Sequence, residues 1–211
     1  MILKELKLQI PDEILVTNCY IIVDENTKEA MVIDPGSHPD EIIEMLDLLE
    51  ANLKYIFLTH CHFDHIAGSP KVKEKKGGSI LISREDYNGL HDGYVSLSNK
   101  EKIVVEADSR VDDGDIIHVG EIELRVISTP GHTKGGLCLY NEENHLLFSG
   151  DTIFAGTWGR TDLPTGSYEE IMNSIKKKIL VLPDDVIVYP GHGRSTMIKY
   201  EKPIYFGIDF K

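Results

Sequence analysis

Residues 59–65 read Thr-His-Cys-His-Phe-Asp-His, and this stretch constrains the chain more than any other. It follows a short apolar run at residues 55–58, which predicts a buried strand. Alternate side chains of an extended backbone share one face, so His60 and His62 can point together at one cation. Asp64 and His65 are adjacent, so both can reach that face only if the chain bends. Imidazole nitrogens and carboxylate oxygens suit zinc, and also iron or manganese, so the stretch predicts a metal site.

The rest of the chain alternates between strand and helix patterns. A loosely alternating edge strand is expected over residues 2–10, and apolar runs predict further strands. The expected strands cover residues 18–23, 30–33, 55–58, 79–82, 116–119, 121–127, 136–140, 145–148 and 186–189. Apolar residues at helical spacing predict helices over residues 40–51, 66–76 and 169–180. Residues 83–107 show weak periodicity and are expected to form an irregular cover.

Composition limits the partners of the chain. The formal net charge of −13 offers no basic field for phosphates, so a nucleic-acid partner is not expected. Three widely spaced cysteines imply no disulfide framework. No run approaches membrane-spanning length, and charges interrupt the apolar residues of the N-terminus, unlike a secretory signal. We expect a soluble, cytoplasmic protein with a small-molecule substrate, and the sequence leaves its oligomeric state open.

Three more potential ligands follow predicted strands and lie beside glycines. These are His132 in Pro-Gly-His-Thr, Asp151 in Ser-Gly-Asp-Thr and His192 in Pro-Gly-His-Gly. Strand ends gather binding residues in α/β folds, and glycine lets a backbone turn sharply or approach a ligand closely. The other histidines lack this setting: His118 and His145 are expected to be ordinary loop residues, His91 a surface residue, and His38 is left unassigned.

The motifs T-H-x-H-x-D-H, P-G-H-T, S-G-D-T and P-G-H-G, in this order, resemble those of the metallo-beta-lactamase superfamily. The resemblance spans residues 18–193. It implies an α/β fold, a four-layer αββα sandwich of two mixed sheets with helices on the outer faces. No linker divides the chain, so residues 1–211 are expected to form a single domain with the metal centre at one edge of the sheets.

The resemblance also implies a ligand set. The first metal would bind His60, His62 and His132, the second Asp64, His65 and His192, and Asp151 would bridge both. One or two Zn²⁺ ions are expected per chain, with iron or manganese as alternatives. Paired metals of this kind lie roughly 3.5–4 Å apart and hold a water between them.

Residues 150–164 are similar to glyoxalase II and its short relatives, which hydrolyse hydroxyacyl-glutathione thioesters. The resemblance implies that a metal-bound hydroxide, oriented by Asp64, attacks a thioester such as lactoyl-glutathione. Arg160 and Asp162 are interpreted as a structural ion pair or as support for the site. Only 19 residues follow His192, so the chain is expected to lack the C-terminal helical region that helps full-length glyoxalase II grip glutathione.

Other functions within the same fold stay open. Persulfide dioxygenases share the fold and a similar Gly-Arg-Thr-Asp segment, but hold one iron with two His and one Asp. Here those would be His60 or His62, His132 and Asp151, a facial triad suited to oxygen chemistry. β-Lactamases of the best-known group carry Cys in place of Asp151, so β-lactam hydrolysis is not expected as the main role. A non-catalytic metal domain is least expected, because a structural ion prefers a closed four-ligand site.

Overall fold

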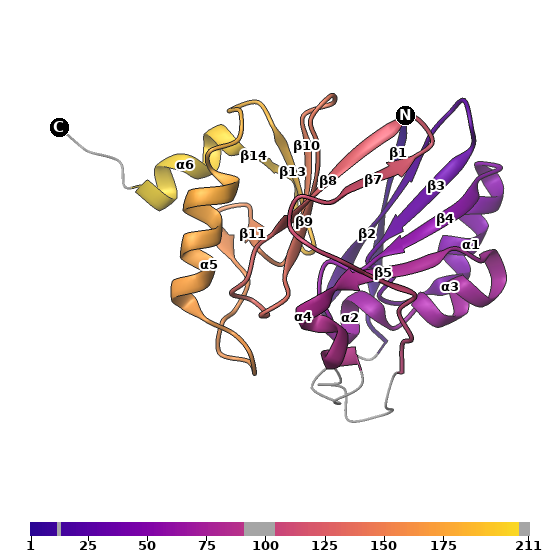
Figure 1. Ribbon diagram of the computed structural model, residues 1–211, viewed down its shortest axis with the longest axis horizontal. Coiled ribbons are helices and arrows are strands. Elements are labelled where there is room, and N and C mark those ends of the chain that lie inside the picture. Colours follow the sequence, from indigo (N-terminus) through magenta and orange to yellow (C-terminus); the bar gives the residue numbers. More distant parts are fainter. Residues whose placement is uncertain (12–13, 91–103, 207–211) are drawn as a thin grey trace.

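The computed structural model describes residues 1–11, 14–90 and 104–206, and within them the chain forms two six-stranded sheets (Figure 1). The first sheet holds β1 (Ile2–Gln9), β2 (Val16–Val23), β3 (Glu29–Ile33), β4 (Asn52–Phe57), β5 (Ser79–Ser83) and β6 (Ser109–Val111). These strands lie in sequence order. The first three are antiparallel and β3 to β6 are parallel, so the sheet is mixed.

The second sheet is built from the C-terminal half of the chain. It holds β7 (Ile116–Val119), β8 (Ile122–Ser128), β9 (Leu137–Asn141), β10 (Leu146–Gly150), β13 (Ile187–Pro190) and β14 (Thr196–Met197). Its order is β14-β13-β10-β9-β8-β7, and only the β10–β13 pair is parallel. A small ribbon of β11 (Ile153–Phe154) and β12 (Thr157–Trp158) follows β10.

Helices cover the outer faces of the two sheets. On the first sheet lie α1 (Pro39–Leu48) and α3 (Ser69–Lys76), and on the second lie α5 (Tyr168–Ser174), its continuation η2 (Ile175–Ile179) and α6 (Ile198–Phe206) (Figure 1). Near the site are the short helices α2 (Phe63–Ile66), α4 (Arg84–Tyr87) and η1 (Asn88–Leu90). The predicted αββα sandwich is therefore confirmed.

Both faces of the central strands are apolar because each sheet is covered on both sides. In β2, Cys19 and Ile21 pack with the helices of the first sheet, whereas Tyr20 and Ile22 pack between the two sheets. In β9, Cys138 faces the helices of the second sheet. Because successive side chains of a strand point to opposite faces of the sheet, the apolar side chains form three buried clusters, one between each pair of neighbouring layers. Their burial is the main force that holds the layers together.

The predicted helix over residues 66–76 is confirmed as α3 over residues 69–76, but it begins later than predicted because a break separates α2 from α3. The backbone N–H of Gly68 donates a 2.7 Å hydrogen bond to the carbonyl of Pro35 at the break. A Cβ at Gly68 would lie 2.7 Å from the same carbonyl oxygen, so only glycine allows this close approach. The break lets α2 present its side chains to the site while α3 covers the sheet.

The described part of the chain holds no helix with the length and apolar character that crossing a bilayer requires. His91 lies outside the described residues, as does much of the segment 83–107 that the sequence predicts to be irregular. The first part of this segment, residues 83–90, is regular and forms the end of β5 and the helices α4 and η1.

Candidate metal centre

Four strand ends deliver the predicted ligands to one place. His60 and His62 follow β4, His132 follows β8, Asp151 follows β10 and His192 follows β13. The chain bends after His62, which precedes α2 with an extended backbone. Asp64 and His65 lie within α2, so the predicted bend is a helical turn. Histidine and carboxylate side chains from both sheets thus meet at one edge of the sandwich.

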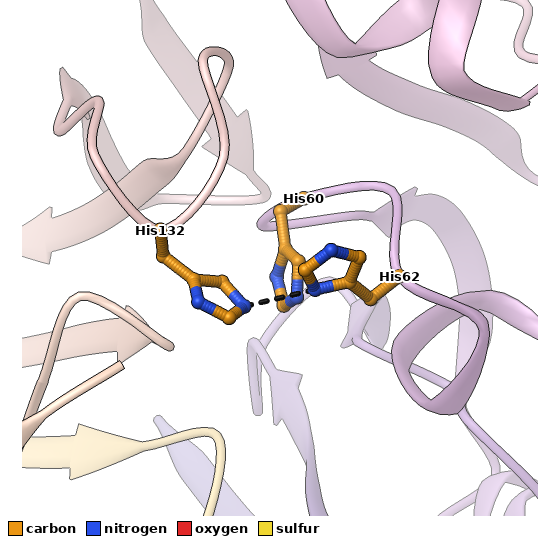
Figure 2. Close-up of side chains that lie close together, drawn as sticks. All are labelled: His60, His62 and His132. Atoms are coloured by element: carbon orange, nitrogen blue, oxygen red, sulfur yellow. Dashed lines mark hydrogen bonds between the residues drawn. The ribbon is translucent and has the colours of Figure 1, made fainter. Parts of the chain in front are cut away.

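The first group of donors consists of three imidazoles. His60, His62 and His132 point toward one another in Figure 2, and His62 Nδ1 lies 2.9 Å from His132 Nε2. The buried Nε2 atom of His60 has no hydrogen-bond partner. Three converging nitrogens, one of them buried and unpaired, are the arrangement that a cation would satisfy.

The second group consists of Asp64, His65 and His192. Oδ2 of Asp64 lies 3.3 Å from His65 Nε2 and 3.2 Å from His192 Nε2. Thr17 Oγ1 donates a 3.1 Å hydrogen bond to the same carboxylate oxygen. This group therefore offers two imidazoles and a carboxylate whose orientation is fixed from β2.

Asp151 lies between the two groups. Its Oδ1 is 3.4 Å from His65 Nε2, and its Oδ2 is 3.5 Å from His132 Nε2 and 3.4 Å from His192 Nε2. Oδ1 is buried and accepts no hydrogen bond. A Cβ at Gly191 would lie 2.3 Å from this oxygen, so the glycine before His192 makes room for the carboxylate. One carboxylate thus reaches both groups of imidazoles, and the seven predicted ligands are brought together.

Hydrogen bonds from outside the cluster fix most of the rings. His65 Nδ1 bonds Asp34 Oδ2 at 2.9 Å, His132 Nδ1 donates to the carbonyl of Arg160 at 2.7 Å, and His192 Nδ1 donates to the carbonyl of Val16 at 2.7 Å. These contacts leave Nε2 of each ring facing the cluster. Such partners orient metal-binding imidazoles and select the tautomer that can coordinate.

The pKa values of His60 and His62 are lowered, whereas that of His192 is raised. Burial lowers the pKa of His60 well below its ordinary value and that of His62 to about 4, and neighbouring imidazoles add to both effects. Burial also acts to lower the pKa of His192, but Asp151 outweighs it and raises that pKa to about 10. Burial acts to raise the pKa of Asp64, yet His65 and His192 hold it well below its usual range. His60 and His62 are therefore neutral and ready to coordinate, whereas His192 would release a proton to a metal.

The sequence did not single out Asp34, which supports this centre from the end of β3. Its carboxylate accepts hydrogen bonds from the backbone N–H of Thr59 at 2.8 Å and from Thr59 Oγ1 at 2.7 Å, and it also bonds His65. Thr59 Oγ1 in turn lies 3.0 Å from His60 Nδ1. The parallel pairing of β3 and β4, whose carboxyl ends meet at the same edge, brings Asp34 to this centre.

Arg160 and Asp162 form a bidentate ion pair, with Arg160 Nε 2.8 Å and Nη2 2.6 Å from the carboxylate oxygens. Both side chains are exposed. Arg160 also lines the mouth of the cleft, and its backbone carbonyl orients His132. The pair therefore has the geometry of structural support, as interpreted from the sequence.

The remaining described histidines lie outside the cluster. His145 is exposed and bonds Asp185, and His118 lies on an exposed position of β7. His38 precedes α1 and bonds the carbonyl of Gln9.

Five of the seven predicted ligands line a cleft of about 310 Å³, together with four apolar side chains and Arg160. The sequence profile of the metallo-beta-lactamase superfamily matches residues 13–192. The chain belongs to the metallo-beta-lactamase superfamily. It is a metallo-hydrolase of that superfamily, whose members bind divalent metals, and the cluster of His and Asp side chains is suitable for such an ion.

Three similar proteins illustrate the range of this superfamily. The chain is 34% identical over 191 residues to hydroxyacylglutathione hydrolase GloC from Haemophilus influenzae, covering 88% of this chain and 89% of that one. A crystal structure of BLEG-1 B3 metallo-beta-lactamase superposes with a TM-score of 0.85 and 32% identity, covering 95% and 96%. A crystal structure of TTHA1623 in a di-iron-bound form superposes with a TM-score of 0.81 and 26% identity, covering 94% and 96%.

Proposed function

We propose that this enzyme hydrolyses thioesters of the hydroxyacyl-glutathione type, such as lactoyl-glutathione, with one or two divalent metal ions, Zn²⁺ first. The observation that carries the proposal is the position of Asp151 between two complete groups of donors. Similarity to a hydroxyacylglutathione hydrolase along most of both chains supports the substrate class.

Different residues of the centre would bind the metal ions and orient the attacking water. Histidines of the two groups, Asp64 and Asp151 would hold the metal ions, which when bound lower the pKa of water and withdraw charge from a carbonyl oxygen. Asp64 would orient the attacking water, because Thr17 fixes its Oδ2 and two imidazoles adjoin that oxygen. A thiolate is a good leaving group, so the chemistry requires no strong general acid beside the cleft.

The lining of the cleft suits a short acyl group. Its apolar walls are formed by Leu15, Phe63, Phe154 and Leu163, and the ring of Phe154 lies edge-on to His192 at 5.9 Å between centroids. Apolar side chains lower the local dielectric beside the donors, which strengthens electrostatic interactions there. The one guanidinium in this lining, that of Arg160, is already paired with Asp162.

An iron-dependent persulfide dioxygenase is the second candidate function. His132 lies near both Asp151 and the other two imidazoles of the first group, so a facial triad fits within this cluster. A dioxygenase with a single iron does not require the second group of donors, Asp64, His65 and His192. The presence of the second group favours the hydrolase.

The test compares three substrate classes on one preparation reconstituted with known metals. Lactoyl-glutathione hydrolysis is followed without oxygen, oxygen uptake is measured with glutathione persulfide, and opening of a β-lactam ring is followed optically. The proposal predicts that thioester hydrolysis is the fastest of the three reactions and that it needs no oxygen. Oxygen uptake by protein with a single tightly bound iron would establish the dioxygenase, and dominant ring opening would establish a β-lactamase.

A further inference from the structure

A buried carboxylate lies behind the first group of histidines and contacts no donor atom of the cluster. Asp86, in α4, is 3% exposed. Its Oδ2 accepts hydrogen bonds from the backbone N–H of Cys61 at 3.1 Å and from Thr133 Oγ1 at 2.7 Å. Its Oδ1 accepts a 2.8 Å bond from the backbone N–H of Gly135. Three donors from two distant segments therefore converge on one side chain.

Those segments are the two loops that carry the first group. Cys61 lies between His60 and His62, and Thr133 directly follows His132. The backbone of Asp86 is held at the start of α4, because its N–H donates a 3.1 Å hydrogen bond to Oγ of the N-cap residue Ser83. The Asp86 carboxylate thus sets the separation between the loop of His60 and His62 and the loop of His132.

The loop that carries His132 approaches α4 closely at Gly135. A Cβ on Gly135 would lie 2.5 Å from Asp86 Oδ1 and 2.2 Å from Ser83 Oγ, so only glycine lets the His132 loop approach α4 this closely. Cys61 and Thr133 are 7% and 1% exposed, so their polar hydrogens depend on Asp86 for partners.

We propose that Asp86 is a positioning residue that holds His60, His62 and His132 at metal-binding distance from one another. This inference rests on the metal centre of the proposed function and is independent of the substrate. Partners that orient metal ligands typically contribute about 10–100-fold to metal affinity. Asp86 acts one step further out, through the two backbone loops, so an effect of about tenfold is expected. The second group, Asp64, His65 and His192, makes none of these bonds and is expected to be unaffected.

The experiment measures Zn²⁺ affinity by competition with a chelator, using two backgrounds that isolate the groups. His192→Ala leaves the first group intact, and His132→Ala leaves the second. In Asp86→Asn an N–H₂ group replaces one of the two carboxylate oxygens. Whichever way the amide turns, this group faces either the donors of Cys61 and Thr133 or the N–H of Gly135. We expect Asp86→Asn to weaken Zn²⁺ binding about tenfold in the His192→Ala background and less than about twofold in the His132→Ala background.

Asp24 provides a matched control for a merely structural role. It is also 3% exposed, and its carboxylate accepts backbone N–H groups of Asn26, Thr27 and Glu121, away from the metal centre. Asp24→Asn should lower thermal stability in the same way as Asp86→Asn and leave Zn²⁺ affinity unchanged in both backgrounds. Equal losses of affinity for the two variants, or equal losses in both backgrounds for Asp86→Asn, would overturn the proposal.

A milder pair of variants keeps the test decisive if Asp86→Asn does not fold. Thr133→Val removes one of the three hydrogen bonds and nearly preserves shape, whereas Thr133→Ser retains the hydroxyl. We expect Thr133→Val to weaken Zn²⁺ binding in the His192→Ala background and Thr133→Ser to restore it. Wild-type affinity in Thr133→Val would contradict the positioning role. Affinity is measured without substrate, so the result stands whether or not the protein hydrolyses thioesters.

Discussion

His65 Nδ1 lies 2.9 Å from Oδ2 of Asp34, and the same carboxylate holds the backbone and hydroxyl of Thr59. One side chain at the end of β3 therefore orients an imidazole of the second group and anchors the segment that leads to His60. Asp34→Asn should weaken metal binding about 10–100-fold, because an amide cannot accept from all of these donors. Chelator competition on Asp34→Asn and wild type checks this, and unchanged affinity would contradict the role of Asp34.

Removal of the carboxylate between the two groups should affect both sites. Asp151 lies within 3.5 Å of imidazoles from each group, whereas His192 belongs to the second group alone. Asp151→Ala is expected to lower total metal content, and His192→Ala to remove mainly one of the two ions. Elemental analysis after dialysis against trace metal measures both. Equal metal content in wild type and Asp151→Ala would exclude the bridging arrangement.

The thiol half of the substrate should matter little. Apart from the donors, the cleft is lined by four apolar side chains and by Arg160, which is paired with Asp162. A remote group that binds substrate and transition state equally changes KM and leaves kcat unaltered. Replacement of glutathione by a truncated thiol should therefore reduce kcat/KM less than tenfold, or less than about 1.4 kcal/mol.

The measurement for this prediction is kcat/KM for one acyl group on several thiols. A preference of about a hundredfold or more for glutathione would reveal a dedicated glutathione pocket.

The three cysteines should be unreactive in the folded protein. All are buried, and burial raises the pKa of Cys138 to about 11 and the pKa values of Cys19 and Cys61 well above normal. The thiolate is the reactive form, so at about pH 8 the folded chain should react slowly with a disulfide reagent. Unfolding in guanidinium should expose all three thiols and serves as the control. Rapid labelling of one thiol before unfolding would show that its site opens.

The sequence predicted the metal-binding residues of the centre better than the residues that hold them in place. His60, His62 and Asp151 could be selected because local motifs, strand ends and a family resemblance all point to them. Asp34 and Asp86 could not, because their importance comes from hydrogen bonds to segments 25 or more residues away. Such pairings are set by sheet topology and leave no local periodicity.

The break between α2 and α3 has a local signal that the prediction did not use. Residues 66–76 include Gly68 and Pro70, which both disfavour a helix interior, and proline is favoured in the first turn of a helix. The carbonyl of Pro35 from a neighbouring loop accepts a hydrogen bond from the N–H of Gly68, which adds a tertiary effect. The four-layer architecture was more predictable, because apolar runs on both faces of a strand imply cover on both sides.

The most direct test of the metal-dependent thioesterase is to titrate metal-free protein with Zn²⁺ while following lactoyl-glutathione hydrolysis without oxygen. The account predicts no hydrolysis at the start, recovery that is complete at about one to two equivalents, and no recovery in Asp151→Ala. Full hydrolysis by metal-free protein, or none at any Zn²⁺ occupancy, would contradict it.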